Sequence, residues 1–114
     1  MNRTPYTLKG NAVTIDYANP IFAGHFPGKP MLPGVYIIQM ATDWACQQTG
    51  KNLTIAEIRK CRYIKPVTPE LGTAFQIDAE LVPDPTEETV FSLVFTLDIQ
   101  GEPVTQLKAT LKIL

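Results

Sequence analysis

The spacing of hydrophobic positions changes once along the chain, from a helical period to a period of two. Residues 35–49, VYIIQMATDWACQQT, are apolar at helical spacing over most of their length. Pro33 and Gly34 suit the start of a helix at this point, and Gly50 suits its end. The pattern therefore predicts one long, mostly apolar helix that other elements must cover on most sides.

Segments with strand character lie on both sides of this helix. Before it, Gly10 and Asn11 have the composition of a tight turn ahead of a short strand at residues 12–17. After it, hydrophobic and polar positions alternate, which is typical of strands with one buried face. The expected strands there are residues 55–67, 73–81, 90–99 and 104–114. Because the connections are short, we expect these strands to pair as an antiparallel meander.

One helix and about five strands indicate an α+β fold, in which a strongly curved antiparallel sheet wraps around the helix. The length of 114 residues fits a single domain, residues 1–114. A domain of this size buries only about two-thirds of the surface of its unfolded chain. Since 45% of the residues are hydrophobic, we expect part of the apolar surface to meet a partner subunit.

Composition and charge exclude several classes of function. The net charge of −1 argues against a nucleic-acid-binding surface. No apolar run approaches the roughly twenty residues of a membrane span, and the first residues lack the apolar core of a signal peptide. Cys46 and Cys61 have neither the spacing of metal ligands nor that of a disulfide framework. We expect reduced thiols in a cytoplasmic protein without a metal site.

The stretch GHFPGKPMLPGV, residues 24–35, holds the only histidine of the chain, His25, in a loop of three prolines and three glycines. Such a loop is stiff and sharply turned, which suits a side chain that must keep its position. An imidazole titrates near neutral pH and can act as a general base. A purely structural histidine in a proline-rich turn remains the alternative.

The predicted helix offers two further features. Its first N–H groups, on Gly34 and Val35, have no acceptor within the helix and can polarise a carbonyl oxygen, although every helix has such an end. Gln39, Asp43 and Gln47 are spaced four residues apart and form one polar stripe. This stripe is either part of an active site or the ordinary solvent face of an amphipathic helix.

The segment NPIFAGHFPGKPMLPGVYIIQM resembles the signature of the β-hydroxyacyl-acyl carrier protein dehydratases of bacterial fatty-acid synthesis, and IRKCRYIKPVTPE resembles the strand that follows the helix in that family. The resemblance implies a hot-dog fold, paired as a dimer, with active sites between the two subunits. It implies that His25 of one subunit takes the C2 proton of a 3-hydroxyacyl thioester. A carboxylate on the central helix of the other subunit then protonates the departing hydroxyl, and Gly34 and Val35 bind the thioester carbonyl. No cofactor is implied.

The chain departs from the family at the catalytic acid. The family carries Glu or Asp fourteen residues after the histidine, where this chain has Gln39. One turn later, where the family often has glutamine, this chain has Asp43. A full turn moves a side chain by about 5 Å along the helix axis, which is large for proton transfer. Either Asp43 replaces the acid with a shifted substrate position, or dehydration has been lost.

Three functions therefore remain open. The first is a dehydratase of acyl-carrier-protein thioesters that uses His25 and Asp43. The second is a non-catalytic or half-active subunit that binds acyl chains or pairs with an active dehydratase. The third is a hot-dog thioesterase in which Asp43 activates water.

Two sets of residues are candidates for binding the substrate and its carrier. An acyl tunnel is expected from the apolar residues Phe22, Phe26, Met31, Leu32 and Ile38, each of which could equally belong to the core. A basic cluster is expected after the helix and would attract the acidic carrier protein: Arg59, Lys60, Arg62 and Lys65. Ordinary exposed strand residues are the alternative for this cluster. The resemblance leaves both a homodimer and a heterodimer with a related dehydratase open.

Overall fold

The structure, a computed structural model, describes residues 4–23 and 28–114, and within them it contains six strands, one short 3-10 helix and one α-helix. The bounds of these elements are β1 Tyr6–Lys9, β2 Ala12–Ile15, the 3-10 helix Pro20–Phe22, α1 Gly34–Thr49, β3 Leu53–Tyr63, β4 Ala74–Pro83, β5 Val90–Ile99 and β6 Glu102–Ile113. The helix begins one residue before the expected start. At its other end, Gly50 has a φ of 70° and its N–H donates to the Cys46 carbonyl oxygen.

All six strands belong to one antiparallel sheet in the order β1-β2-β4-β5-β6-β3. The meander prediction is correct for β4, β5 and β6 but wrong for β3, which pairs with β6 and not with β4. The connection at residues 64–73 is too long for a hairpin and carries the chain from one edge of the sheet to its interior. Its start is fixed because the N–H groups of Ile64 and Lys65 both donate to the Val104 carbonyl oxygen.

The ends of several strands also differ from expectation. β3 ends four residues early, at Tyr63, because the chain turns away ahead of Pro66, whose ring cannot donate to a strand ladder. β2 likewise ends at Ile15 and not at residue 17. The strand β1, Tyr6–Lys9, was not expected, because its four residues are too few for a clear alternation. It pairs with β2 across the turn at Gly10 and Asn11 that the sequence predicts.

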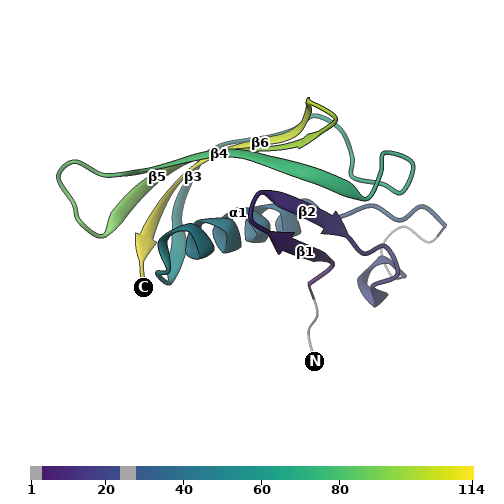
Figure 1. The fold of residues 1–114 in the computed structure, drawn as a ribbon, viewed down its shortest axis with the longest axis horizontal. Coiled ribbons are helices and arrows are strands. Elements are labelled where there is room, and N and C mark those ends of the chain that lie inside the picture. The colour runs from purple at the N-terminus through teal and green to yellow at the C-terminus, as the bar shows by residue number, and fades with distance from the viewer. Residues whose placement is uncertain (1–3, 24–27) are drawn as a thin grey trace.

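The core lies between α1 and the concave side of the sheet (Figure 1). The helix contributes the buried residues Ile37, Met40, Ala41, Trp44 and Ala45. The strands contribute alternating residues such as Phe75, Phe95 and Leu107, none more than 1% exposed. The β1–β2 hairpin lies along the side of the helix (Figure 1). The Trp44 indole N–H donates to the Asn11 side-chain oxygen at 2.8 Å.

A curved sheet around one long helix is the hot-dog arrangement, so the expected α+β fold is confirmed. The 16 residues of α1 fall short of what crossing a bilayer requires, and no other helix among the described residues is long and apolar enough to do so.

Candidate active site

The predicted base, His25, and the predicted tunnel residue Phe26 lie outside the described residues. The chain is described again from Gly28, and it leads directly into α1. The N–H of Leu32 donates to the Val67 carbonyl oxygen at 2.9 Å, which ties this segment to the connection between β3 and β4. Leu32 itself is buried. The residues that immediately precede the helix are therefore anchored.

A cavity of about 330 Å³ lies at the start of α1. Its walls are mostly apolar: Met31, Leu32, Gly34, Ile37, Tyr63, Ile64, Lys65, Pro66 and Val67. Pro33 precedes the helix and offers no side-chain cap, and its carbonyl oxygen accepts from the Tyr36 N–H at 3.0 Å. The N–H groups of Gly34 and Val35, which come before Tyr36, have no acceptor within the helix. A carbonyl group that entered here would meet these donors and the positive end of the helix dipole.

Tyr63 covers this start of the helix. A Cβ atom added to Gly34 would lie only 2.5 Å from Cζ of the Tyr63 ring, so a larger residue than glycine does not fit unless the ring moves. Partial burial, followed by the hydrogen bond and charge of Cys61, raises the pKa of Tyr63 to about 12. At neutral pH the phenol is therefore protonated and able to donate.

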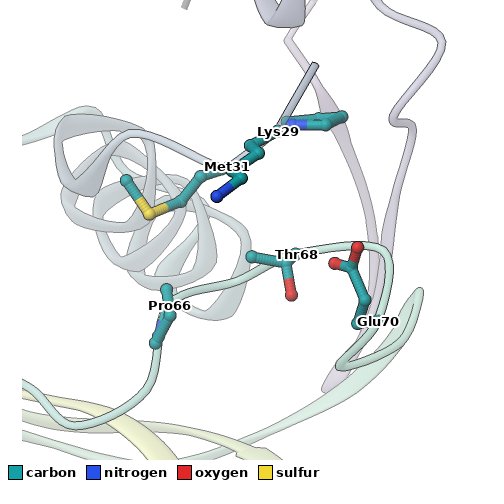
Figure 2. A pocket seen from close by; sticks show the side chains of 6 residues that line it. Lys29, Met31, Pro66, Thr68 and Glu70 are labelled. Carbon is teal, nitrogen blue, oxygen red and sulfur yellow. The ribbon is translucent and has the colours of Figure 1, made fainter. Parts of the chain in front are cut away.

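A second cavity, of about 430 Å³, adjoins the first, because Met31 and Pro66 line both. Figure 2 shows Lys29 on one side of it, Glu70 on the other, and Thr68 between them. The two cavities together provide apolar space next to the helix start and polar groups further out. This combination suits an elongated ligand with an apolar part and a polar part.

The polar stripe of the helix lies elsewhere. Gln39 and Gln47 are exposed and Asp43 is half-buried. The O–H of Tyr6, on β1, donates to Oδ2 of Asp43 at 2.5 Å. Tyr6 is buried, and the sequence analysis did not single it out, because no local pattern relates two residues that are 37 positions apart.

The cavity at the helix start and the Asp43 carboxylate do not face each other within one chain. Gly34 and Asp43 are nine residues apart, and at about 100° per residue they point to opposite sides of the helix. Neither of the two cavities near Gly34 is lined by Gln39 or Asp43. Within one chain, the helix start and the Asp43 carboxylate therefore lie at separate places among the described residues.

The structure separates the residues of the expected acyl tunnel. Met31 and Leu32 line the cavity at the helix start, as a tunnel requires. The α1 side chain that lines it is that of Ile37 and not of the expected Ile38, which lies about 100° further around the helix. Phe22 is buried, with its ring centroid 5.3 Å from that of Tyr17.

The expected basic cluster does not form one patch. Lys60 lines a cavity with Val94 and Lys108, whose exposed side chains lie on the side of the sheet away from α1. Lys65 lines the cavity at the helix start, and its Nζ lies 2.6 Å from Oε2 of Glu102. Arg59 and Arg62 are exposed on β3, and Arg59 lies 3.6 Å from Glu57. Lys60 and Arg62 lie two residues apart on β3, opposite Lys108 and Gln106 of β6, and therefore share a face, whereas Lys65 lies beyond the end of the strand.

Cys46 and Cys61 are free thiols, as expected. The Cys46 sulfur accepts a hydrogen bond from the Leu53 N–H at 3.4 Å, which ties the end of α1 to the start of β3. This contact explains Cys46 as a packing residue.

Among solved structures, the fold is similar to that of the BH2602 protein of Bacillus halodurans, described with CoA, with a TM-score of 0.66 and 18% identity over 97% of this chain and 72% of that one. It is also similar to the dehydratase heterocomplex ApeI:P of Xenorhabdus doucetiae, with a TM-score of 0.58 and 20% identity over 91% of this chain and 89% of that one. A hexameric acyl-CoA thioesterase matches with a TM-score of 0.57 and 14% identity, covering 97% of this chain and 70% of that one. At these identities the similarity shows the fold alone.

Curated proteins give a closer sequence match. A 3-hydroxyacyl-[acyl-carrier-protein] dehydratase FabZ of Herpetosiphon aurantiacus is 33% identical over 69 residues, which are 54% of this chain and 48% of that protein. Its counterpart in Haemophilus influenzae is 29% identical over 92 residues, 74% of this chain and 61% of that protein. The chain thus spans about half to three-fifths of the length of these relatives.

The family profile described as ApeI-like, ApeI dehydratase, covers residues 7–106. This range includes α1, the loop with His25, both cavities at the helix start and the polar stripe. The match extends over most of the chain, well beyond the loop and helix that carry the resemblance in the sequence. The chain belongs to the ApeI-like dehydratase family.

Proposed function

We propose that this protein removes water from 3-hydroxyacyl thioesters carried on acyl carrier protein, giving trans-2-enoyl thioesters. The observation that carries the proposal is the carboxylate of Asp43, held by Tyr6 on the otherwise uncharged stripe of the central helix. Membership of the ApeI-like dehydratase family supports the type of reaction. The names of the curated relatives support the carrier-bound hydroxyacyl substrate.

The elimination needs one base and one acid. His25 accepts the proton from C2, and the electrons of that C–H bond form the C2–C3 double bond. The C3–O bond breaks as Asp43 donates its proton to the departing oxygen, and water leaves. Gly34 and Val35 donate N–H groups to the thioester oxygen, where negative charge develops as the C2 proton is removed. Proton exchange with solvent then returns His25 to its neutral form and Asp43 to its acid form.

We place this reaction between two chains. His25 and the helix start of one chain lie near each other in sequence, whereas Asp43 points to the other side of its own helix. Two copies in a dimer bring the helix start of one copy to the carboxylate of the other. The acyl chain occupies the apolar cavity lined by Met31, Leu32 and Ile37, and the carrier arm follows the adjoining cavity past Lys29. The exposed Arg59 and Arg62 attract the acidic carrier protein.

The reaction is tested by incubating the purified protein with a 3-hydroxyacyl carrier protein and measuring the intact mass of the carrier. We expect a loss of mass equal to one water, with the acyl group still attached. His25→Ala serves as the control and should abolish the change. Release of the acyl group with a free thiol on the carrier would instead identify a thioesterase and contradict the proposal.

The placement of the site between chains is tested by mixing two inactive variants, His25→Ala and Asp43→Asn. A mixed dimer contains one site with both residues intact and one site with neither. After unfolding and refolding together, the mixture should recover about a quarter of the wild-type rate, since about half of the dimers are mixed and each has one working site. No recovery, with dimers confirmed by light scattering, would place both residues of a site in the same chain.

A second candidate function is a subunit that pairs with an active dehydratase. Two observations favour it: Gln39 stands at the position where the resembling family keeps its acid, and a structure similar in fold is described as the dehydratase heterocomplex ApeI:P. In this case the protein alone leaves the hydroxyacyl carrier unchanged. Addition of a related dehydratase then gives dehydration at a rate that depends on His25.

A further inference from the structure

The hydrogen bond between β1 and the middle of α1 is made to the carboxylate of Asp43, the acid of the proposed reaction. Tyr6 is 6% exposed, and its ring belongs to the hydrophobic core. Its backbone is fixed as well, since Tyr6 is paired with Ile15 of β2. From this rigid position its O–H donates to Oδ2 of Asp43. The tyrosine is thus the better fixed of the two partners, and the half-buried carboxylate is held by it.

The Tyr6 phenol is protonated at neutral pH and can donate a hydrogen bond there. Burial raises its pKa well above the ordinary value of a tyrosine, and the hydrogen bond and negative charge of Asp43 raise it further. The Gln39 side chain acts more weakly in the opposite direction. Burial and the Asp43 carboxylate therefore both favour the protonated form of Tyr6.

A hydrogen-bond donor on one oxygen of a carboxyl group influences which of the two oxygens carries the proton. Oδ2 of Asp43 accepts from Tyr6, which favours a proton on Oδ1, because the unprotonated oxygen of a carboxyl group is the better acceptor. No hydrogen bond to Oδ1 is recorded among the described residues. Among the described residues, Oδ1 is therefore the oxygen of Asp43 that has no hydrogen-bond partner, and it is available to a substrate hydroxyl.

The same hydrogen bond becomes stronger as Asp43 loses its proton. An O–H group binds a charged carboxylate oxygen more tightly than a neutral carboxyl oxygen. The gain therefore develops in the step in which Asp43 donates its proton, which is the condition for an interaction to increase the rate and not only the binding.

We propose that Tyr6 is a positioning residue for dehydration, which holds Oδ2 of Asp43 so that Oδ1 faces the substrate hydroxyl and which stabilises the carboxylate as the proton leaves. This inference rests on the proposed function, in which Asp43 donates that proton. The competing interpretation is that the contact only ties β1 to the helix.

The test is Tyr6→Phe in the full chain, assayed for dehydration of a 3-hydroxyacyl carrier protein. The ring and its packing are kept, and only the donor is lost. We expect kcat to fall about tenfold, the difference between a charged and a neutral hydrogen bond. KM should change less than about twofold, because the group acts on the leaving oxygen and not on the bound chain. In an Asp43→Asn background the same substitution should leave the remaining rate unchanged.

A matched control separates positioning from simple attachment. Asn11→Ala removes a different side-chain hydrogen bond between the β1–β2 hairpin and α1, the one from Trp44, without touching Asp43. It should leave kcat at the wild-type value. Thermal melting of all variants shows whether any loss of rate reflects a loss of folded protein.

The possible outcomes distinguish a failure of the positioning role of Tyr6 from a failure of the proposed function. If Asp43→Asn lowers the rate and Tyr6→Phe does not, or if Tyr6→Phe and Asn11→Ala lower it equally, the positioning role is wrong while the proposed function stands. If Tyr6→Phe lowers the rate equally in the wild-type and Asp43→Asn backgrounds, the positioning role is also wrong while the proposed function stands. If wild type is inactive, or Asp43→Asn is as active as wild type, the proposed role of Asp43 fails, and the role of Tyr6 fails with it.

Discussion

The start of α1 and its middle, nine residues further on, present two different kinds of surface. At the start, Gly34 and Tyr63 border an apolar cavity, and the first N–H groups of the helix lack a side-chain cap. Its lining includes neither a carboxylate nor an imidazole among the described residues. In the middle, Asp43 supplies a carboxylate held by Tyr6, on the other side of the helix from that cavity.

In the proposed reaction, one chain therefore separates the binding of the substrate from the donation of a proton. Neither region is complete on its own: the cavity has no described acid, and the carboxylate does not line that cavity. Two copies in the proposed dimer combine them. The polar stripe is then neither a plain solvent face nor a complete active site. In the proposed dimer it is one half of a site whose other half lies on the neighbouring chain.

The largest expected effect concerns the carboxylate, and it decides whether the middle of the helix takes part in chemistry at all. Asp43→Asn should lower the rate of dehydration by about 10²–10⁴-fold, the contribution of a well-placed acid. Gln39→Glu should add little activity, because two carboxylates one turn apart disfavour each other's ionisation and compete for the same position. Single-turnover assays on a 3-hydroxyacyl carrier protein measure both.

The opposite pair of results would contradict this account. If Asp43→Asn is silent and Gln39→Glu creates activity, the acid belongs one turn earlier and has been lost in this chain. The protein would then be a partner subunit, and the contact between Tyr6 and Asp43 would be structural. Gln47→Glu, one turn after Asp43 on the same stripe, controls for the general effect of an added negative charge.

The local parts of the fold could be predicted from the sequence. The bounds of α1 differ by one residue from expectation, because proline and glycine mark its ends and its apolar residues recur at the helical period. The range of β5 agrees fully, since apolar residues alternate along it. The stripe of Gln39, Asp43 and Gln47 follows from the same helical period.

The contacts between distant segments could not be predicted. Nothing local indicates that β3 pairs with β6, because its partner is chosen by the way the sheet closes around the helix. The sequence predicts Ile38 in the cavity wall, whereas the structure has Ile37 there, and the cause is related. The helical period defines the faces of a helix, but only the packed structure shows which face meets the cavity. Tyr6 and Tyr63 were missed for the same reason, since each acts on a residue far away in the sequence.

The smallest expected effect concerns the start of the helix and tests the close contact between Gly34 and Tyr63. Gly34→Ala places a methyl group where the Tyr63 ring now lies. The ring is 52% exposed, so it can turn outward, and the free energy of unfolding should fall by less than about 1 kcal/mol. Tyr63→Phe should not relieve the contact, because Cζ of the ring lies 2.5 Å from the added Cβ and is still present.

Tyr63→Ala removes the whole ring and should reverse the sign of the effect that Gly34→Ala has on the free energy of unfolding. In that background Gly34→Ala should be neutral or stabilising by up to about 1 kcal/mol, the advantage of alanine over glycine in a helix. Denaturant unfolding of the four proteins gives the free energies. Steady-state kinetics provide a second measurement. If the cavity receives the thioester, Gly34→Ala should raise KM, because the displaced ring and the added methyl group alter the entrance of the cavity. If the effect of Gly34→Ala on stability reverses in the Tyr63→Ala background but KM is unchanged, the contact between Gly34 and Tyr63 is confirmed. The cavity at the helix start then does not bind the substrate.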